Sequence, residues 1–244
     1  IEKYGNTSAL CMVFSTKGKE GKITTHLLDP GVLSGEIFST CSGSILMSGT
    51  LYPPGMYADI LSLPKRLTTK TSYKSPFAGE RRPVLIAKDV TTRYNERSEV
   101  MWNRMRSHIQ ALIDGIEGHI AVFCPSYRLM DEIIGDVYFK GVKKRVESRD
   151  WSKDDIDKIV AELKSERSSG NRILLCGVFG ARLSEGIDYN DGILSSVVCI
   201  GIPNPPPSVL SNSLKEYVGD KFGKENAWRY TVTQPAINSI LQAM

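Results

Sequence analysis

From residue 83 onward, short apolar runs alternate with longer stretches in which apolar residues recur at helical spacing. The apolar runs predict strands at residues 83–89, 119–124, 143–146, 172–178 and 195–202. The amphipathic stretches predict helices at residues 96–117, 126–139 and 152–166. Strands that are apolar on both faces and separated by helices indicate a parallel sheet with helices on each side. The predicted fold class is therefore α/β.

The first 75 residues differ in character, because their candidate strands at residues 23–30 and 44–50 are too few to close a core. Residues 67–82 are polar, basic and proline-containing, which is typical of a linker. The pattern predicts that residues 1–75 are the end of a preceding domain and its linker, and that residues 76–244 form a nearly complete α/β domain.

Composition narrows the class of protein only a little. Of the 244 residues, 24% are charged and 41% are hydrophobic, which is ordinary for a soluble globular protein. No apolar run reaches the roughly 18–20 residues of a membrane-spanning helix, and the first residues lack the layout of a signal peptide. A soluble intracellular protein without a membrane partner is predicted. The net charge of +4 permits a polyanionic partner without requiring one.

The cysteine and histidine residues are too scattered to predict a metal site. Cysteine occurs at Cys11, Cys41, Cys124, Cys176 and Cys199, with no CxxC pair among them. These residues are expected to be reduced, buried thiols that act as small hydrophobes. The three histidines are also scattered, so we expect no metal ion in this chain.

The strongest local signal is the loop at residues 177–189, directly after a predicted strand. Three glycines, which let a backbone approach a phosphate or a sugar closely, occur at Gly177, Gly180 and Gly186. Arg182 adds a positive charge, while Glu185 and Asp188 add acceptors suited to hydroxyls or to an arginine partner. The alternative is a turn whose glycines and acids serve only the backbone geometry.

Two further segments end predicted strands with polar residues. Ser48, Gly49 and Thr50 place two hydroxyls at a strand tip, where they can relay hydrogen bonds between a nucleotide and a neighbouring domain. An ordinary turn is the alternative for this tripeptide. Ser126 can cap a helix whose N-terminus receives a nucleic-acid phosphate, and Tyr127 and Arg128 beside it can stack and neutralise charge. Simple capping and packing is the alternative there.

Two signatures of a complete ATPase are missing from the sequence. It contains no GxxxxGK[ST] loop to cradle a triphosphate and no DEAH-like acidic box to hold magnesium. The 244-residue chain is therefore expected to be unable to form a whole ATPase site by itself.

Taken in order, five segments of the chain resemble helicases of the XPD family, in superfamily two: SGTLYP, SPF, FCPSYRLM, GARLSEGIDY and the terminal INSILQAM. SGTLYP at residues 48–53 resembles the third helicase motif, and FCPSYRLM at residues 123–130 resembles the fourth. GARLSEGIDY at residues 180–189 resembles the fifth motif, and QAM at residues 242–244 the opening of the sixth. The resemblance spans nearly the whole chain and corresponds to the C-terminal half of such a helicase.

This resemblance implies a motor with two RecA-like domains that hydrolyses ATP with Mg²⁺ and moves 5′ to 3′ along single-stranded DNA. It also implies a 4Fe-4S cluster and an arch domain upstream of this chain, with no cluster in the chain itself. Nucleotide excision repair is the implied process, with repair-complex proteins and the remaining N-terminal part of the helicase as partners. The implied location is cytoplasmic in a prokaryote and nuclear in a eukaryote.

The resemblance also implies roles for individual residues. The residues at the catalytic cleft would be Glu185, Asp188 and Gln242. The nucleotide would be bound by Ser184 and Gly186. The two motor domains would be coupled through Ser48, Gly49 and Thr50. Single-stranded DNA would be held by Ser126, Tyr127 and Arg182.

One departure from the family pattern limits what the chain can do alone. The sixth motif of the family continues past the glutamine with arginines that reach the transferring phosphoryl group, and this sequence stops at Met244. The chain is therefore expected to be a truncated and inactive piece of a motor. Alternatives are a DinG-like or RNA-directed helicase of the same superfamily, and a non-catalytic RecA-like module that binds nucleic acid.

Overall fold

The computed structural model describes residues 7–18, 20–74, 83–185, 187 and 189–244. The chain divides into two compact units. Unit 1 consists of Ile1–Arg82 and Pro205–Pro235, and unit 2 of Pro83–Asn204 and Ala236–Met244. Residues 205–235, which the sequence analysis assigned to the second domain, thus group with the N-terminal part of the chain.

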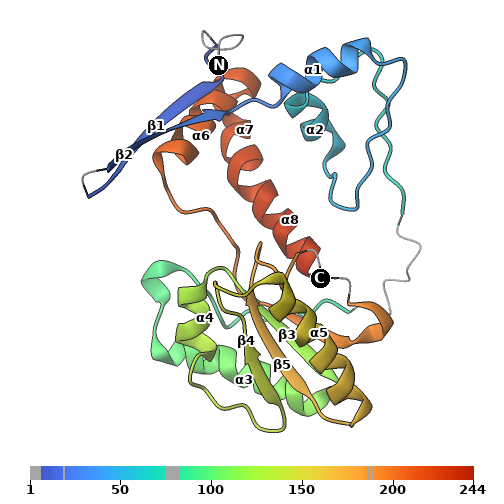
Figure 1. The fold of residues 1–244 in the computed structure, drawn as a ribbon, viewed down its shortest axis with the longest axis vertical. Coiled ribbons are helices and arrows are strands. Elements are labelled where there is room, and N and C mark those ends of the chain that lie inside the picture. Colours follow the sequence, from blue (N-terminus) through green and yellow to red (C-terminus); the bar gives the residue numbers. More distant parts are fainter. Residues whose placement is uncertain (1–6, 19, 75–82, 186, 188) are drawn as a thin grey trace. The chain divides into compact units, whose positions relative to one another are not determined.

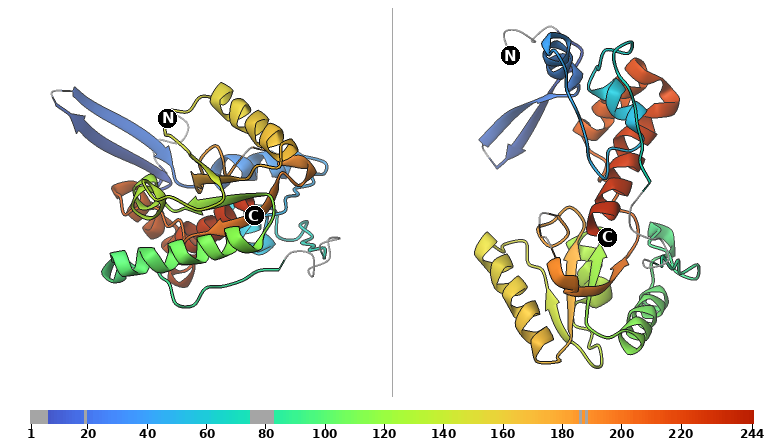
Figure 2. Two further views of the ribbon diagram at one scale, coloured as in Figure 1. Left: turned by 90° about the horizontal axis from the view of Figure 1, so that it is seen from below. Right: turned by 90° about the vertical axis from the view of Figure 1, so that its right-hand side faces the viewer.

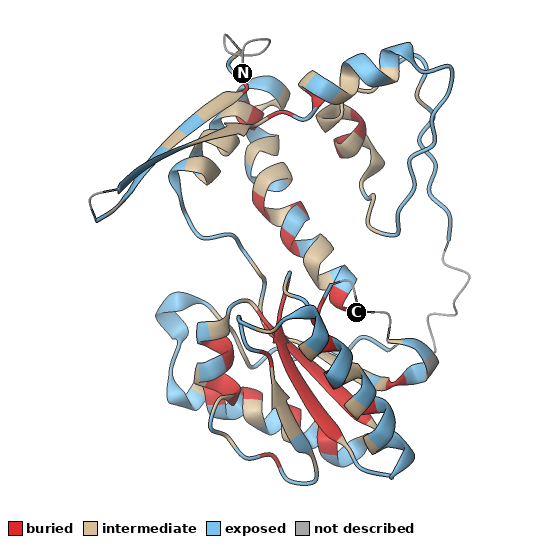
Figure 3. Cartoon of the chain, in the orientation of Figure 1, coloured by how far each residue is buried: buried red, intermediate tan, exposed pale blue. Residues whose placement is uncertain are grey.

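Unit 2 is built on a four-stranded parallel sheet with the strand order β4-β5-β3-β6 (Figure 1). Its strands are β3 (His119–Cys124), β4 (Lys143–Val146), β5 (Ile173–Val178) and β6 (Leu194–Cys199). Every residue of the two central strands is buried (Figure 3). The α/β class and four of the five strands predicted in this part of the chain are therefore confirmed.

Helices cover both faces of this sheet. They are α3 (Glu99–Gly115), α4 (Tyr127–Ile134) and α5 (Lys153–Ser168). Ile120 and Val122 of β3 pack with α3 and α4, whereas the alternate residues Ala121 and Phe123 pack with α5. Figure 2 shows α3 and α5 on opposite sides of the sheet. The alternation of side chains along a buried strand thus divides the core into two layers.

Each of these helices begins at a serine whose hydroxyl accepts a backbone N–H. Ser98 and Ser126 cap α3 and α4, and Ser152 forms a reciprocal capping box with Asp155 at the start of α5. The helix predicted at residues 126–139 ends earlier, with Gly135 as its C-cap. That part of the prediction was wrong because glycine favours helix termination.

Unit 1 contains an antiparallel hairpin and several helices. The hairpin consists of β1 (Leu10–Lys17) and β2 (Glu20–Leu27). The helices are α1 (Gly31–Thr40), α2 (Pro54–Ile60), α6 (Val209–Phe222), α7 (Lys224–Trp228) and a π-helical turn, Arg229–Thr233. The last helix, α8 (Gln234–Ala243), contains the division between the two units.

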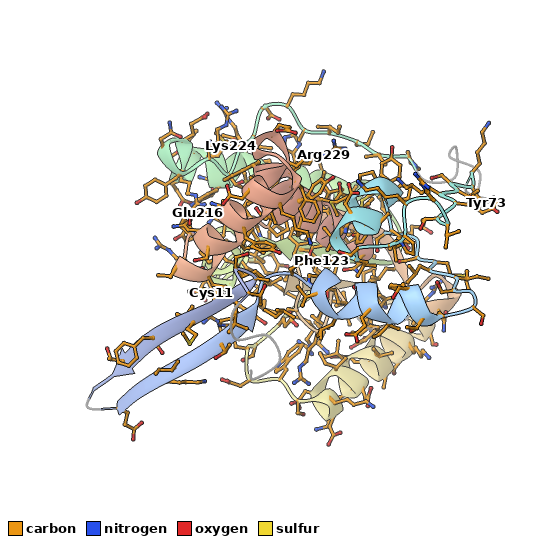
Figure 4. All side chains as sticks on the ribbon, turned by 90° about the horizontal axis from the view of Figure 1, so that it is seen from above. Cys11, Tyr73, Phe123, Glu216, Lys224 and Arg229 are labelled. Atoms are coloured by element: carbon orange, nitrogen blue, oxygen red, sulfur yellow. The ribbon has the colours of Figure 1, made fainter. Side chains whose placement is uncertain are left out.

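Asp29 holds the sequence-distant parts of unit 1 together. Its side chain is 2% exposed and accepts hydrogen bonds from the backbone N–H of Gly31 (2.8 Å), from Tyr217 (2.6 Å) and from Lys221. Burial raises the pKa of Asp29, but the hydrogen bonds from Lys221, Tyr217 and Gly31 outweigh it and lower the pKa below its ordinary value. Cys11 and Glu216, both labelled in Figure 4, are among the residues that line an open groove beside α6.

Two predicted strands do not form. Residues 44–50 and 83–89 have no strand structure, and their apolar side chains are largely exposed, with Ile45 at 88% and Leu85 at 86%. Both runs are apolar, but a strand also needs a neighbouring strand to pair with. The described part of the chain supplies no such neighbour for either run.

The cysteine prediction is confirmed in part. Cys124 and Cys176 are free thiols within the core, and burial raises the pKa of Cys176 to about 12. Cys41 is exposed, and Cys11 and Cys199 are half-buried, so the expectation of full burial was wrong for these three. Among the described residues, no helix is both long and apolar enough to cross a membrane.

Candidate functional site

The candidate site lies at the carboxyl edge of the sheet in unit 2. Cys124 at the end of β3 pairs with Val178 at the end of β5, and Val146 at the end of β4 pairs with Cys176, so the three strands end within two residues of one another. The loops that follow them carry Ser126, Glu147 and Arg182. Loops at this edge are the usual ligand-binding position of an open parallel sheet.

The loop after β5 is closed by short-range backbone hydrogen bonds. The N–H of Ala181 donates to the carbonyl of Val178 (3.1 Å), and the N–H of Ser184 donates to the carbonyl of Ala181 (3.1 Å). Gly180 has a φ of 73°, in the left-handed region that glycine adopts without strain. This tight turn brings residues 181–185 back over the strand end.

Glu147, which the sequence analysis missed, is the buried centre of this edge. The residue is 4% exposed, and its carboxylate accepts the backbone N–H groups of Val178 (3.1 Å) and Leu183 (3.1 Å). It therefore joins the end of β4 to both sides of the loop after β5. Burial raises the pKa of Glu147, and the backbone hydrogen bonds from Val178 and Leu183 partly oppose the rise.

Gly177 leaves room for that carboxylate. A Cβ atom at this position would lie 2.9 Å from Oε2 of Glu147 and 3.1 Å from Cε1 of Phe123. The glycine is thus required by a close approach within the protein. The only sequence signal for the partner was an acidic residue directly after the run KKRV.

Ser184 and Glu185, two of the predicted site residues, differ in exposure. Ser184 is buried, and its hydroxyl donates to the carbonyl of Val178 (2.9 Å), with the carbonyl of Ala181 as a second acceptor (3.1 Å). Its hydroxyl therefore closes the loop from within. Glu185 is exposed at the carboxyl edge. Gly186 and Asp188 lie outside the described residues.

Ser126 and Tyr127 begin helix α4 beside this loop. The hydroxyl of Ser126 accepts the N–H of Leu129 (3.2 Å), which confirms the predicted N-cap. Tyr127 is half-buried against the core, and the guanidinium of Arg149 lies 4.9 Å from the centre of its ring. Burial and the charge of Glu147 raise the pKa of Tyr127, while Arg149 and Arg182 act in the opposite direction.

The remaining predicted residues are placed in two different parts of the chain. Gln242 is exposed in the last turn of α8, and the adjacent Ala243 packs in the same apolar cluster as Leu183 of the loop. Ser48 and Thr50 belong to unit 1, where their hydroxyls hydrogen-bond to each other at 3.2 Å in an exposed turn.

Metal-ligating side chains do not gather in the described part of the chain. No group of three His, Cys, Asp or Glu side chains that could hold a metal ion occurs among the described residues. Buried His119 is instead fixed within the sheet, because its Nδ1 accepts the N–H of Ile173 (3.0 Å) and its Nε2 lies 2.7 Å from the carbonyl of Leu163. That pairing indicates the tautomer with the proton on Nε2.

Comparison with known proteins shows that the chain is similar to helicases. The family described as a helicase C-terminal domain matches residues 109–244. The ATP-dependent DNA helicase XPD of Sulfolobus acidocaldarius is 32% identical over 207 residues, covering 82% of this chain and 35% of that protein. The ATP-dependent DNA helicase chl-1 of Caenorhabditis elegans is 24% identical over 214 residues, covering 80% of this chain and 25% of that protein.

Solved structures show the same likeness at the level of the fold. A structure of an XPD helicase gives a TM-score of 0.66 at 27% identity, covering 91% of this chain and 39% of that chain. A structure of XPD in its apo form gives a TM-score of 0.66 at 25% identity, covering 95% of this chain and 46% of that chain. The chain thus spans less than half the length of each of these relatives.

Proposed function

Because the chain belongs to the family of helicase C-terminal domains, we propose that it is part of an ATP-dependent DNA helicase of the XPD type. The observation that carries this proposal is the match over residues 109–244, a range that includes the carboxyl edge with Ser126, Glu147 and Arg182. The parent helicase hydrolyses ATP and translocates 5′ to 3′ on single-stranded DNA, with nucleotide excision repair as its process.

The proposal assigns different roles to the two parts of the chain. Residues 1–75 are the end of the first motor domain, with Ser48, Gly49 and Thr50 coupling the two motor domains. Residues 76–244 are the second motor domain. The ligands of Mg²⁺, the triphosphate-binding loop and a 4Fe-4S cluster belong to other parts of the helicase.

Within the second motor domain, the exposed carboxylate of Glu185 faces the nucleotide or an arginine of the partner motor domain. Asp188 and Gln242 serve the same cleft, and Ser184 and Gly186 lie at the nucleotide. Ser126, Tyr127 and Arg182 lie on the DNA side. Exposure of Glu185 and the charge of Arg182 support this division, because a phosphate track repels carboxylates and attracts guanidinium groups.

A test requires the longer protein that contains this chain. It should hydrolyse ATP faster in the presence of single-stranded DNA and should separate a duplex with a 5′ tail but not one with a 3′ tail. Glu185→Ala should reduce DNA-stimulated ATP hydrolysis by roughly tenfold or more, while single-strand affinity stays within about threefold. Absence of ATP turnover in the unsubstituted protein would instead identify a non-catalytic nucleic-acid-binding module.

A further inference from the structure

Arg149 is exposed, and its side chain is positioned by the aromatic ring of Tyr127. Its guanidinium lies over the ring of Tyr127, with 4.9 Å between the guanidinium carbon and the ring centre. The ring is half-buried and packs against the core formed with α3 and α4. Because the Tyr127 ring packs against the core and lies beneath Arg149, a nucleic-acid base has less room to stack on it than the sequence suggested.

A second arginine is fixed relative to the first through Glu147. Arg149 follows Glu147 by two residues, and Arg182 directly precedes Leu183, whose N–H donates to the Glu147 carboxylate at 3.1 Å. The N–H of Val178 donates to the same carboxylate at 3.1 Å. One buried carboxylate thus joins the two loops that carry the arginines.

The positive charges of both arginines are accessible to a ligand at the carboxyl edge. Arg149 and Arg182 are exposed, and neither forms an ion pair with a carboxylate of the described residues. The nearby Arg128, by contrast, pairs with Glu132 at 2.8 Å. A planar guanidinium can donate two parallel hydrogen bonds to one phosphate, so two such groups can hold consecutive phosphates of a strand.

We propose that Arg149 and Arg182 together bind the phosphate backbone of single-stranded DNA, and that Tyr127 is a positioning residue for Arg149 rather than a base-stacking platform. This inference rests on the proposed function and names the side chains that bind the phosphates of single-stranded DNA. A motor that moves along any sequence holds backbone rather than base edges, which matches a pair of arginines without base-reading groups.

The test measures binding of the 244-residue chain to two labelled strands, an oligothymidylate and an abasic oligonucleotide of the same length, over a series of salt concentrations. Arg149→Ala should weaken binding to both strands roughly three- to tenfold and reduce the salt slope by about 0.7, the share of one phosphate contact on single-stranded DNA. Arg149→Lys should keep the slope. Lys164→Ala, which removes an exposed charge on α5, is the matched control and should change neither quantity.

Tyr127 is tested through its coupling to Arg149. Tyr127→Ala should weaken binding to both strands equally. In the Arg149→Ala background, the same substitution should cause no further loss of affinity. Tyr127→Phe, which keeps an aromatic face, should bind nearly as the unsubstituted chain does. A loss confined to the strand that carries bases would show that Tyr127 stacks on bases, and the positioning role would be wrong.

The outcomes separate this inference from the function on which it rests. If the unsubstituted chain binds both strands and Arg149→Ala does not weaken binding, the inference fails while the helicase assignment stands. If Arg149→Ala weakens binding of ATP but not of DNA, the arginine belongs to a nucleotide site and the inference also fails. If the unsubstituted chain binds neither strand, the DNA roles given to this edge fail, and the inference fails with them.

Discussion

At the scale of single residues, the candidate site is organised around the buried carboxylate of Glu147. Glu147 loses hydration on burial, and two backbone N–H groups compensate for that loss. The same two hydrogen bonds fix the shape of the loop that presents Arg182 and Glu185. Gly177 is part of this arrangement, because any side chain there would displace the carboxylate.

We expect Glu147→Ala to lower the free energy of unfolding by about 2–4 kcal/mol, since it leaves two buried N–H groups without an acceptor. Glu147→Gln should have a smaller effect, because its amide oxygen can still accept one of them. Urea unfolding followed by circular dichroism measures both. Exposed Glu117→Ala is the control and should stay within about 0.5 kcal/mol of the unsubstituted chain. Equal effects at Glu147 and Glu117 would contradict the bridging role.

At the scale of elements, strand β4 and helix α5 are joined by ion pairs. Glu162 accepts hydrogen bonds from Arg145 (2.7 Å) and Lys143 (2.6 Å), and Glu166 also pairs with Lys143 (3.0 Å). The hydrogen bond from Arg145 is the largest influence that lowers the pKa of Glu162 to about 2, with Lys143 adding to it against the effect of burial. β4 is an edge strand, so this pairing helps to hold it against the helix.

The lowered pKa predicts how stability depends on pH. A carboxylate whose folded pKa is below its unfolded value stabilises the folded state above about pH 4.5 and loses that contribution as the pH falls toward 2. Glu162→Gln should therefore lower stability at pH 7 by about 1–2 kcal/mol, less than the full shift implies because solvent screens the pair. The difference from the unsubstituted chain should shrink below pH 4.5, as measured by urea unfolding at each pH. A difference that is constant with pH would show that the ion pairs do not contribute.

The elements also show what a sequence can and cannot predict. The runs at residues 119–124 and 172–178 were recognisable because both faces are apolar, and the helix caps at Ser126 and Ser152 because capping depends on local chemistry. The run at residues 44–50, which has three consecutive apolar residues, did not become a strand, since pairing depends on distant segments. Glu147 was missed for the same reason, because its partners lie more than thirty positions along the chain.

At the scale of the whole molecule, the sequence predicts a chain that cannot turn over ATP. It has neither a GxxxxGK[ST] loop nor a DEAH-like acidic box, and those groups bind the triphosphate and its magnesium ion. The purified 244-residue chain should release phosphate no faster than a blank, with or without single-stranded DNA, in a coupled-enzyme assay. Turnover that survives repurification and increases with DNA would refute this expectation.

The division into two units predicts that a substitution which destabilises one unit leaves the stability of the other unchanged. All three groups that donate to Asp29, on Gly31, Tyr217 and Lys221, belong to unit 1. Asp29→Ala removes their acceptor and should lower the free energy of unfolding of unit 1 by about 2–4 kcal/mol. Hydrogen exchange should then accelerate at least tenfold in α6 while the amides of β3 and β5 keep their protection, because regions can open as separate cooperative units. Asp220→Ala, an exposed acidic residue of α6, provides the control and should leave both regions unchanged. If Asp29→Ala accelerates exchange equally in α6 and in the sheet, the chain unfolds as a single cooperative body despite its two compact units.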